Sequence, residues 1–331
     1  MKKLTGLFAS LVLIASLITG CAQNSGSTSQ ISSAGSDIVP AQSGDASTSS
    51  EEDTSEWPRT YVDKLGREVT IEKQPERIAV TYLPYWEYLI ALELPPVAAV
   101  SAENYNNTWE PFLTTDYGTD KVIDLGNKVN KEKLLEVQPD LILAASDEGI
   151  EELEKIAPVI VLDGQVKMDW KYGIREIAKV VGKEDTAEAR IEATEERLAE
   201  YREKLQAQYQ DETVMLISVM GKDSYHSARR PAFYDREIGL GLNAPEGYPE
   251  TNQYEQVTLE GIAQMNPDYI FLAVFDGDEA IVEELESNSV WQSLTAVKNN
   301  HVIKLDGAAH SPSILATEYT VEQVVNSLLQ D

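Results

Sequence analysis

Aromatic, basic and histidine side chains follow several short apolar stretches that we expect to form strands. In open parallel sheets, ligands bind outside the carboxyl ends of the strands, so a site belongs in the loops there. The candidates in these loops are Tyr82, Tyr85, Trp86, Tyr105, Tyr225, Arg229, Arg230 and His310. Arginine forms charge-assisted hydrogen bonds to anionic oxygens, and aromatic rings offer rigid contact area. The set predicts a binding site for a large, oxygen-rich, often anionic small molecule.

These residues also have purely structural interpretations. Tyr85 and Trp86 fit packing at the start of a helix, and Arg229 with Arg230 fits a solvated pair beside Pro231. Adjacent arginines are unusual in so acidic a chain, which favours a ligand-binding role for Arg229 and Arg230.

Two glutamates occupy equivalent positions in a segment that occurs twice, at 130–144 and 258–272. Each copy starts at a good helix N-cap, Asn130 or Thr258, and has a glutamate two residues later. Pro-Asp and an apolar strand follow seven residues after each glutamate. Glu132 and Glu260 would therefore lie in the first turns of matching helices. A carboxylate there stabilises the helix dipole by ~0.3–1 kcal/mol, but two matched charges also fit a partner with two-fold symmetry.

Charge and composition exclude several classes of function. The 331 residues carry a net charge of −29, with 56 acidic and 27 basic residues, which disfavours binding to nucleic acid. The only histidines are His226, His301 and His310, too few for a site that captures a bare metal with several imidazoles. Cys21 is the single cysteine, so an intramolecular disulfide is impossible.

The first 56 residues predict a secreted, anchored protein. Two lysines at the start precede an apolar run over residues 7–18, which is typical of a signal peptide over 1–20. The run Ile-Thr-Gly-Cys at 18–21 resembles the lipobox of bacterial lipoproteins, in which the cysteine carries the lipid. Residues 22–56 contain eleven serines, six acids and no lysine or arginine. We therefore expect 21–56 to be a lipidated cysteine followed by a flexible tether.

From residue 57 onward, short apolar strands alternate with helical segments, which predicts mainly parallel sheets covered on both faces. A hairpin over 59–71 opens this part of the chain. Residues 184–209 contain no Gly or Pro and repeat their apolar residues with a helical period. The predicted architecture is an α/β protein with an N-terminal lobe over 57–182, one long helix within 183–210, and a C-terminal lobe over 211–331.

The order and spacing of these segments resemble the class III substrate-binding proteins of ABC importers, and specifically the iron–siderophore receptors. The segments that carry the resemblance are 74–80, 89–97, 156–159 and 293–299, together with the repeated segment. Glu93 stands where the family usually has glycine.

The resemblance implies two Rossmann-like lobes joined by one rigid helix, with little relative motion. It implies capture of a ferric siderophore in the interlobe cleft, and delivery to an ABC permease dimer with its ATPase. Glu132 and Glu260 match the glutamates that dock onto permease arginines. The siderophore holds the iron, so no metal ligands, intrinsic cofactor or enzyme activity are expected of this monomeric, extracytoplasmic lipoprotein.

Three alternatives stay open at this point. Relatives of the same fold bind haem, for which His226, His310 or Tyr225 would be axial ligands, and others bind cobalamin. A lipid-anchored hydrolase is suggested only by Ser311 next to His310, because the expected body has no nucleophile-elbow motif.

Overall fold

The computed structural model describes residues 57–104, 119–275 and 277–330. The predicted lipidation site Cys21, the tether and Tyr105 lie outside these residues. A hairpin opens the described chain, with β1 (Arg59–Val62) antiparallel to β2 (Glu68–Ile71), as predicted. Asp63 fixes its turn by accepting hydrogen bonds from the backbone amides of Leu65 and Arg67.

The N-terminal lobe is built on a five-stranded sheet in the order β5-β4-β3-β6-β7, in which every pair is parallel. Its strands are β3 (Ile78–Val80), β4 (Ala98–Ala99), β5 (Ile123–Asp124), β6 (Leu141–Ala144) and β7 (Val159–Val161). Its helices are α1 (Leu83–Ala91), α4 (Lys131–Val137), α5 (Ile150–Leu153) and α6 (Trp170–Val181), with 3-10 turns η1 (Thr119–Lys121) and η2 (Gly164–Lys167).

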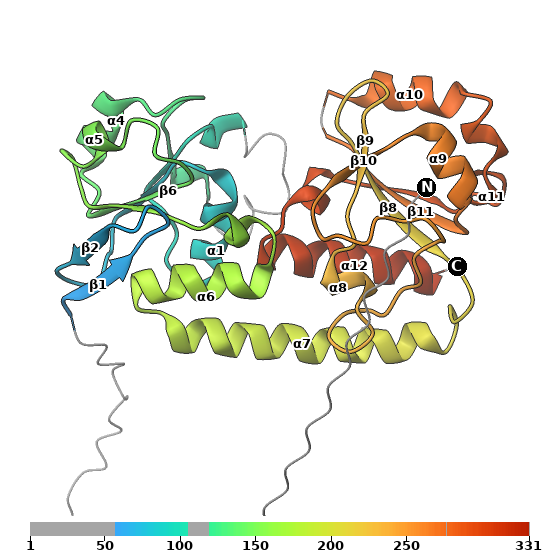
Figure 1. The fold of residues 1–331 in the computed structure, drawn as a ribbon, viewed down its shortest axis with the longest axis horizontal. Helices are drawn as coiled ribbons and strands as arrows, with labels where there is room; N and C mark the ends of the chain where they lie inside the picture. The colour runs from blue at the N-terminus through green and yellow to red at the C-terminus, as the bar shows by residue number, and fades with distance from the viewer. Residues whose placement is uncertain (1–56, 105–118, 276, 331) are drawn as a thin grey trace, which may run out of the picture. The chain divides into compact units, whose positions relative to one another are not determined.

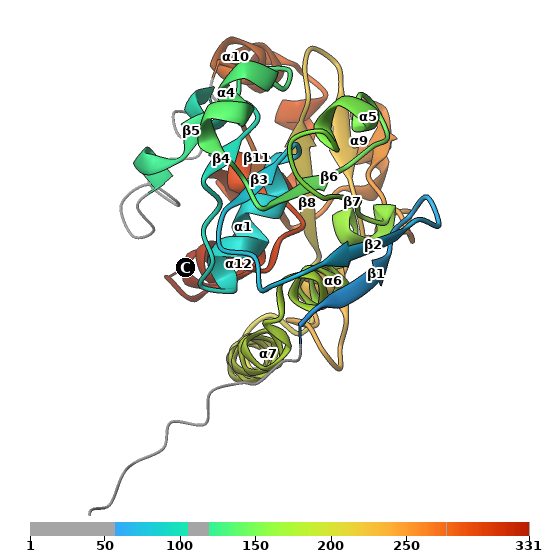
Figure 2. The same ribbon diagram turned by 90° about the vertical axis from the view of Figure 1, so that its left-hand side faces the viewer.

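Alternate residues of each strand face opposite layers of helices in this lobe. Ile78 and Val80 belong to the core that includes α1 and α6, whereas Ala79 belongs to the core that includes α4 and α5. Because both faces of β3, β4, β6 and β7 are buried, these strands are continuously apolar. Figure 2 shows this lobe with α6 and α7 seen nearly end-on on one side of the sheet.

The C-terminal lobe has a mixed sheet in the order β10-β9-β8-β11-β12. Its strands are β8 (Val214–Val219), β9 (Tyr225–Ser227), β10 (Glu255–Val257), β11 (Tyr269–Ala273) and β12 (Val302–Leu305). Its helices are α8 (Pro231–Tyr234), α9 (Leu259–Met265), α10 (Glu279–Ser287), α11 (Thr295–Lys298) and α12 (Ile314–Gln330), with turns η3 (Trp291–Ser293) and η4 (Gly307–His310). Strands β8, β11 and β12 are parallel, while β9 and β10 are antiparallel additions that the sequence analysis left as loop.

Helix α7 (Glu184–Gln206) connects the two lobes, and it packs against both α6 and α12 (Figure 1). Its 23 residues end three residues before the predicted limit. Thr194, which interrupts the apolar stripe of this helix, is buried and donates a hydrogen bond to the Glu318 carboxylate on α12 at 2.5 Å. Thr194 therefore makes a polar contact at a position where the helical period would place an apolar residue.

Helix α12 is a second connection, which the sequence analysis missed. It follows the C-terminal sheet in the chain, but it packs against α1, α6 and α7. One continuous core of buried residues includes side chains from both sheets and from these helices. The described residues accordingly belong to one compact unit.

The repeated segment forms the same structure in both lobes. Asn130 and Thr258 cap α4 and α9 by accepting backbone hydrogen bonds, and Gln138 and Asn266 end them in the left-handed conformation. The aspartate that follows then ties the unit to the start of a neighbouring strand. Asp140 accepts the amides of Glu76 and Arg77, and Asp268 accepts the amide of Thr213.

Glu93 adopts a positive φ of 59°, in the left-handed region that favours glycine. This explains why a glycine suits this position after α1.

Candidate functional site

A cavity of about 560 Å3 lies between residues of the two lobes, a volume within the range of small-molecule sites. Its N-terminal wall comes from the carboxyl ends of β3 and β4 and from the end of η2, and its C-terminal wall from η4 and the loop before β10. The lining residues are Thr81, Tyr82, Leu83, Pro84, Val100, Ser101, Asn104, Lys167, Met168, Tyr254, His310, Ser311 and Pro312. The cavity thus lies at the carboxyl ends of strands, where a binding site is expected.

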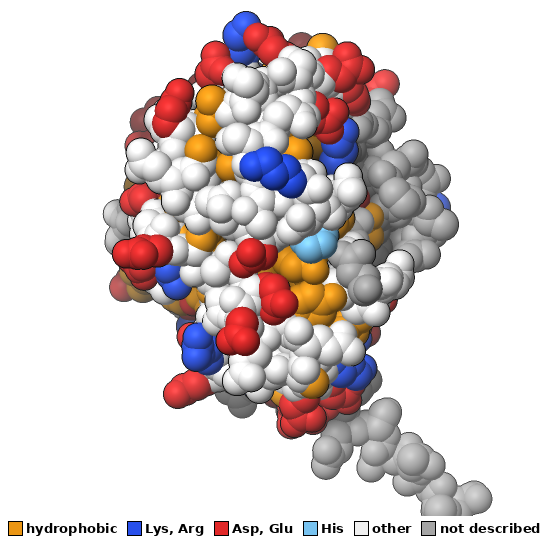
Figure 3. Space-filling view, turned by 90° about the vertical axis from the view of Figure 1, so that its right-hand side faces the viewer, with side chains coloured by type: hydrophobic (Ala, Val, Ile, Leu, Met, Phe, Trp, Pro, Cys, Tyr) orange, Lys and Arg blue, Asp and Glu red, His pale blue; other side chains and the backbone are white. Residues whose placement is uncertain are grey.

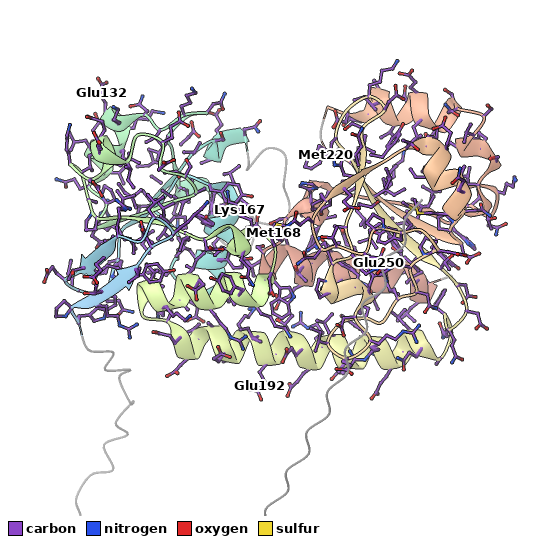
Figure 4. The ribbon with its side chains drawn as sticks, viewed as in Figure 1. Glu132, Lys167, Met168, Glu192, Met220 and Glu250 are labelled. Carbon is purple, nitrogen blue, oxygen red and sulfur yellow. The ribbon has the colours of Figure 1, made fainter. Side chains whose placement is uncertain are left out.

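Tyr82 and Lys167 form the polar part of the N-terminal wall. The Lys167 ammonium lies 4.4 Å from the centroid of the Tyr82 ring, a cation–π distance. Burial, followed by the charge of Lys64, lowers the pKa of Lys167. Among the described residues no carboxylate pairs with this lysine, because every ion pair of that part of the chain involves another base. Figure 4 shows Lys167 and Met168 at the end of η2.

Tyr254 and His310 form the aromatic part of the C-terminal wall. Their rings stack with centroids 4.2 Å apart, and the ring of Phe275 meets His310 edge-on at 5.6 Å. His310 Nδ1 lies 3.3 Å from the Ser218 hydroxyl. Burial, followed by the charges of Arg230 and His226, lowers the pKa of His310 to about 4, so the ring is neutral near pH 7.

Of the residues predicted for the site, Tyr82 and His310 line the cavity, whereas Tyr85 and Trp86 lie elsewhere. Both side chains are fully buried in α1 and are absent from the cavity lining. The Tyr85 ring packs edge-on against Tyr82 with centroids 5.1 Å apart. These two residues follow the core-packing interpretation, because α1 is covered on all sides by the sheet, α6 and α12.

Tyr225, Arg229 and Arg230 are also absent from the cavity lining. Tyr225 lies in β9, where antiparallel pairing with β8 turns it into the core with only 4% exposure. The buried Arg230 guanidinium donates hydrogen bonds to the carbonyls of Ala309 and Ser311, at 2.7 and 3.0 Å. Arg230 therefore supports the wall of the cavity from behind.

Arg229 is half-buried and engaged elsewhere. Its guanidinium donates to the Pro249 carbonyl at 3.2 Å and to the Glu250 carboxylate at 2.9 Å. Neither predicted arginine is thus free to meet an anionic ligand in the cavity.

Lys167 and Tyr254 line the cavity, but they were not predicted from the sequence. Tyr254 follows a loop rich in Gly and Pro. It directly precedes β10, a short strand that was not predicted, and then the repeated segment. Lys167 lies in a polar stretch with no periodic signal. The signal for Lys167 in the sequence is its place shortly after β7, because the chain leaves the carboxyl end of that strand to form η2.

The residues behind the alternative functions have other hydrogen-bond partners. Ser311 is buried, and its hydroxyl donates to both carboxylate oxygens of Glu87, at 3.1 and 3.0 Å, rather than to a histidine. His226 lies on β9 with its Nε2 3.1 Å from the Ser224 hydroxyl, and it is absent from the cavity lining.

Glu132 and Glu260 are both exposed in the first turns of α4 and α9. Figure 4 shows Glu132 well apart from Lys167. The two glutamates are thus available to a partner without involvement of the cavity.

A smaller cavity of about 310 Å3 adjoins the first one, since both include Thr81 and Val100 in their walls. It is lined by Lys128, Lys131 and Glu148, among others, and Lys131 lies 3.9 Å from the Glu152 carboxylate.

Within residues 57–104, 119–275 and 277–330, no group of three His, Cys, Asp or Glu side chains is placed to hold a metal ion. None of the helices in the same ranges is both long enough and apolar enough to cross a bilayer. On the face drawn in Figure 3, acidic side chains are scattered and basic side chains do not merge into a patch.

Comparison with known proteins gives consistent matches. A family model described as "Periplasmic binding protein" matches residues 78–309. The iron(3+)-hydroxamate-binding protein FhuD of Bacillus subtilis is 30% identical over 316 residues, covering 92% of this chain and 90% of that protein. The crystal structure of a FhuD fold-family component of a Fep/Fec-like ferrichrome ABC transporter from Bacillus subtilis has a TM-score of 0.69 at 25% identity, covering 82% of this chain and all of that one. The triscatecholate siderophore binding protein FeuA of the same organism, complexed with ferri-bacillibactin, has a TM-score of 0.67 at 24% identity, covering 82% and 99%.

Proposed function

Because the chain belongs to the periplasmic binding protein family, we propose that it captures a ferric siderophore and delivers it to the permease of an ABC importer. The observation that carries this proposal is the interlobe cavity of about 560 Å3, whose walls combine aromatic rings, hydroxyls and one lysine. Relatives named for iron-hydroxamate and triscatecholate binding support the ligand class. Tyr82, Lys167, Tyr254 and His310 are the side chains that contact the ligand.

The protein works as a binding component and not as an enzyme. Iron stays wrapped in the siderophore as cargo, so the chain contributes hydrogen bonds and ring contacts to the organic part of the complex. The buried Ser311 hydroxyl serves Glu87 and leaves His310 to stack on Tyr254, so these residues do not act as a nucleophile and base.

Delivery uses Glu132 and Glu260, which meet basic residues of a permease dimer that works with an ATPase. Their equal placement in α4 and α9 suits a partner with two similar halves. The protein acts as a monomer outside the cytoplasm, held at the membrane by a lipid on Cys21.

A fluorescence titration of the chain without its leader and Cys21 tests the binding function. We expect saturable quenching by a ferric siderophore and little response to its iron-free form. Tyr254→Ala and His310→Ala should each weaken binding at least tenfold, whereas Tyr201→Ala, on α7 away from the cavity, should leave the affinity unchanged. Binding of haemin with a new Soret band, or of cobalamin, without any siderophore response would overturn the proposal.

A further inference from the structure

We propose that the ligand is a ferric chelate without net charge at its metal centre, as in a ferric trihydroxamate, and that Lys167 is the one charged group that contacts it. This inference rests on the proposed function and narrows it to one substrate class. The fold alone does not set that class, because similar folds belong to proteins named for ferrichrome transport and for triscatecholate siderophore binding.

The charges of the cavity wall carry the inference. Of the thirteen lining residues, Lys167 is the only lysine or arginine and none is a carboxylate. His310 adds no charge near neutral pH, since its buried ring resists protonation. Among the described residues, the lining of the cavity thus offers a single positive charge.

Arg230 places a positive charge behind the wall, but its side chain does not line the cavity. The buried Arg230 guanidinium is occupied by the carbonyls of Ala309 and Ser311. The buried Glu87 carboxylate, bonded to Ser311, brings the opposite charge to the same region. In the adjoining smaller cavity, Lys131 is paired with Glu152 and Lys128 shares the wall with Glu148.

The charge of a ferric chelate depends on its binding groups. A hydroxamate loses one proton when it binds iron, so three hydroxamates balance the charge of Fe(III). A catecholate loses two protons, so three catecholates leave three negative charges, and citrate complexes are also anionic. Moving an anion from water into a partly enclosed site is costly unless cations pair with it. A chain with 56 acidic and 27 basic residues adds long-range repulsion.

The remaining lining suits a neutral chelate. Leu83, Pro84, Val100, Met168 and Pro312 offer apolar surface for an aliphatic ligand backbone. Thr81, Ser101 and Asn104 offer polar groups for its amides. Lys167, held over the Tyr82 ring without an ion pair in the described chain, is placed to donate a charge-assisted hydrogen bond to the iron-binding oxygens.

The test is a comparative titration of the chain without its leader and Cys21, with ferrichrome, ferri-bacillibactin and ferric citrate as probes. We expect ferrichrome to bind at least about 100-fold more tightly than the two anionic chelates. Its affinity should change less than about twofold between roughly 50 and 500 mM NaCl, because little net charge is neutralised.

Variants at Lys167 separate a local contact from a general charge effect. Lys167→Gln should weaken ferrichrome binding roughly tenfold, as expected for the loss of a charge-assisted hydrogen bond. Lys204→Gln is the matched control, since it makes the same change in net charge at an exposed lysine in the last turn of α7, outside the cavity lining. It should leave the affinity unchanged, and both variants should keep the parental melting temperature.

The outcomes distinguish this inference from the proposed function. Tighter binding of ferri-bacillibactin or ferric citrate would overturn the neutral-chelate inference while the receptor function stands. Equal ferrichrome affinities for Lys167→Gln, Lys204→Gln and the parent would overturn the role of Lys167. No binding of any ferric chelate would overturn the proposed function itself.

Discussion

The Ser311 hydroxyl, next to the cavity on the C-terminal side, donates to the carboxylate of Glu87 on α1 at 3.1 and 3.0 Å. The Ser313 hydroxyl donates to the same carboxylate. Close by, the Tyr88 hydroxyl lies 3.1 Å from the Val166 carbonyl and 3.2 Å from the Pro312 carbonyl. A buried carboxylate of one lobe is thus satisfied by hydroxyls of the other, which ties the back of the cavity together.

This arrangement predicts that Ser313→Ala destabilises the fold. Loss of one donor leaves a fully buried carboxylate less well satisfied, at a cost of about 1–3 kcal/mol in the free energy of unfolding. Urea denaturation measures it, with the exposed Ser287→Ala on α10 as the control expected to stay within about 0.5 kcal/mol. Equal midpoints for the two variants would show that the Glu87 cluster contributes nothing.

The buried ring of His310 predicts a pH-dependent stability. Its pKa falls from 6.5 to about 4 in the folded chain, so the unfolded state binds a proton in this range when the native state does not. Stability is therefore lost as the pH drops below about 6.5. This residue accounts for about 2 kcal/mol between pH 7 and pH 5.

Denaturation of the parent and of His310→Gln at pH 7 and pH 5 measures this contribution, because the carboxylates titrate alike in both proteins. The parent should lose more stability on acidification than the variant does. An equal loss in both would mean that His310 titrates normally.

The exposed pair Glu132 and Glu260 predicts a separation of binding from transport. The double variant Glu132→Ala/Glu260→Ala should abolish uptake of the radiolabelled ferric siderophore and leave its affinity for the purified protein intact. The control is Glu136→Ala/Glu192→Ala, which removes two exposed glutamates from other positions on α4 and α7. Normal uptake by the first pair would remove the docking assignment.

The continuous core predicts little lobe motion on ligand binding. Helices α7 and α12 both bridge the lobes, and a packed helical layer deforms less than a pair of extended crossover strands. Small-angle scattering with and without ligand should give the same radius of gyration within error. A clear decrease on binding would contradict the prediction.

Cys21 predicts membrane attachment through lipid. Cys21→Ala should stop incorporation of labelled palmitate and release the protein from the membrane fraction. A Ser25→Ala change in the tether serves as the control and should do neither. Retention of Cys21→Ala on the membrane would point to the leader itself as the anchor.

The sequence by itself determined the elements that depend on local order. The helical period of apolar residues predicted the long α7, and the repeated segment predicted α4 and α9 with their exposed glutamates, followed by β6 and β11. Such features involve neighbours within a few residues, so residue type and spacing are sufficient to reveal them.

Only the tertiary structure decided which chemical groups face the cavity. Arg230 and Tyr225 have the right chemistry for a ligand, but non-local partners hold them, namely the Ala309 and Ser311 carbonyls and the β8–β9 pairing. Lys167 has no distinguishing neighbours in the sequence and becomes the cation of the site through the packing of η2 beside Tyr82. Burial and hydrogen-bond partners depend on chain segments that are distant in sequence, and they determine whether a polar side chain serves the fold or the ligand.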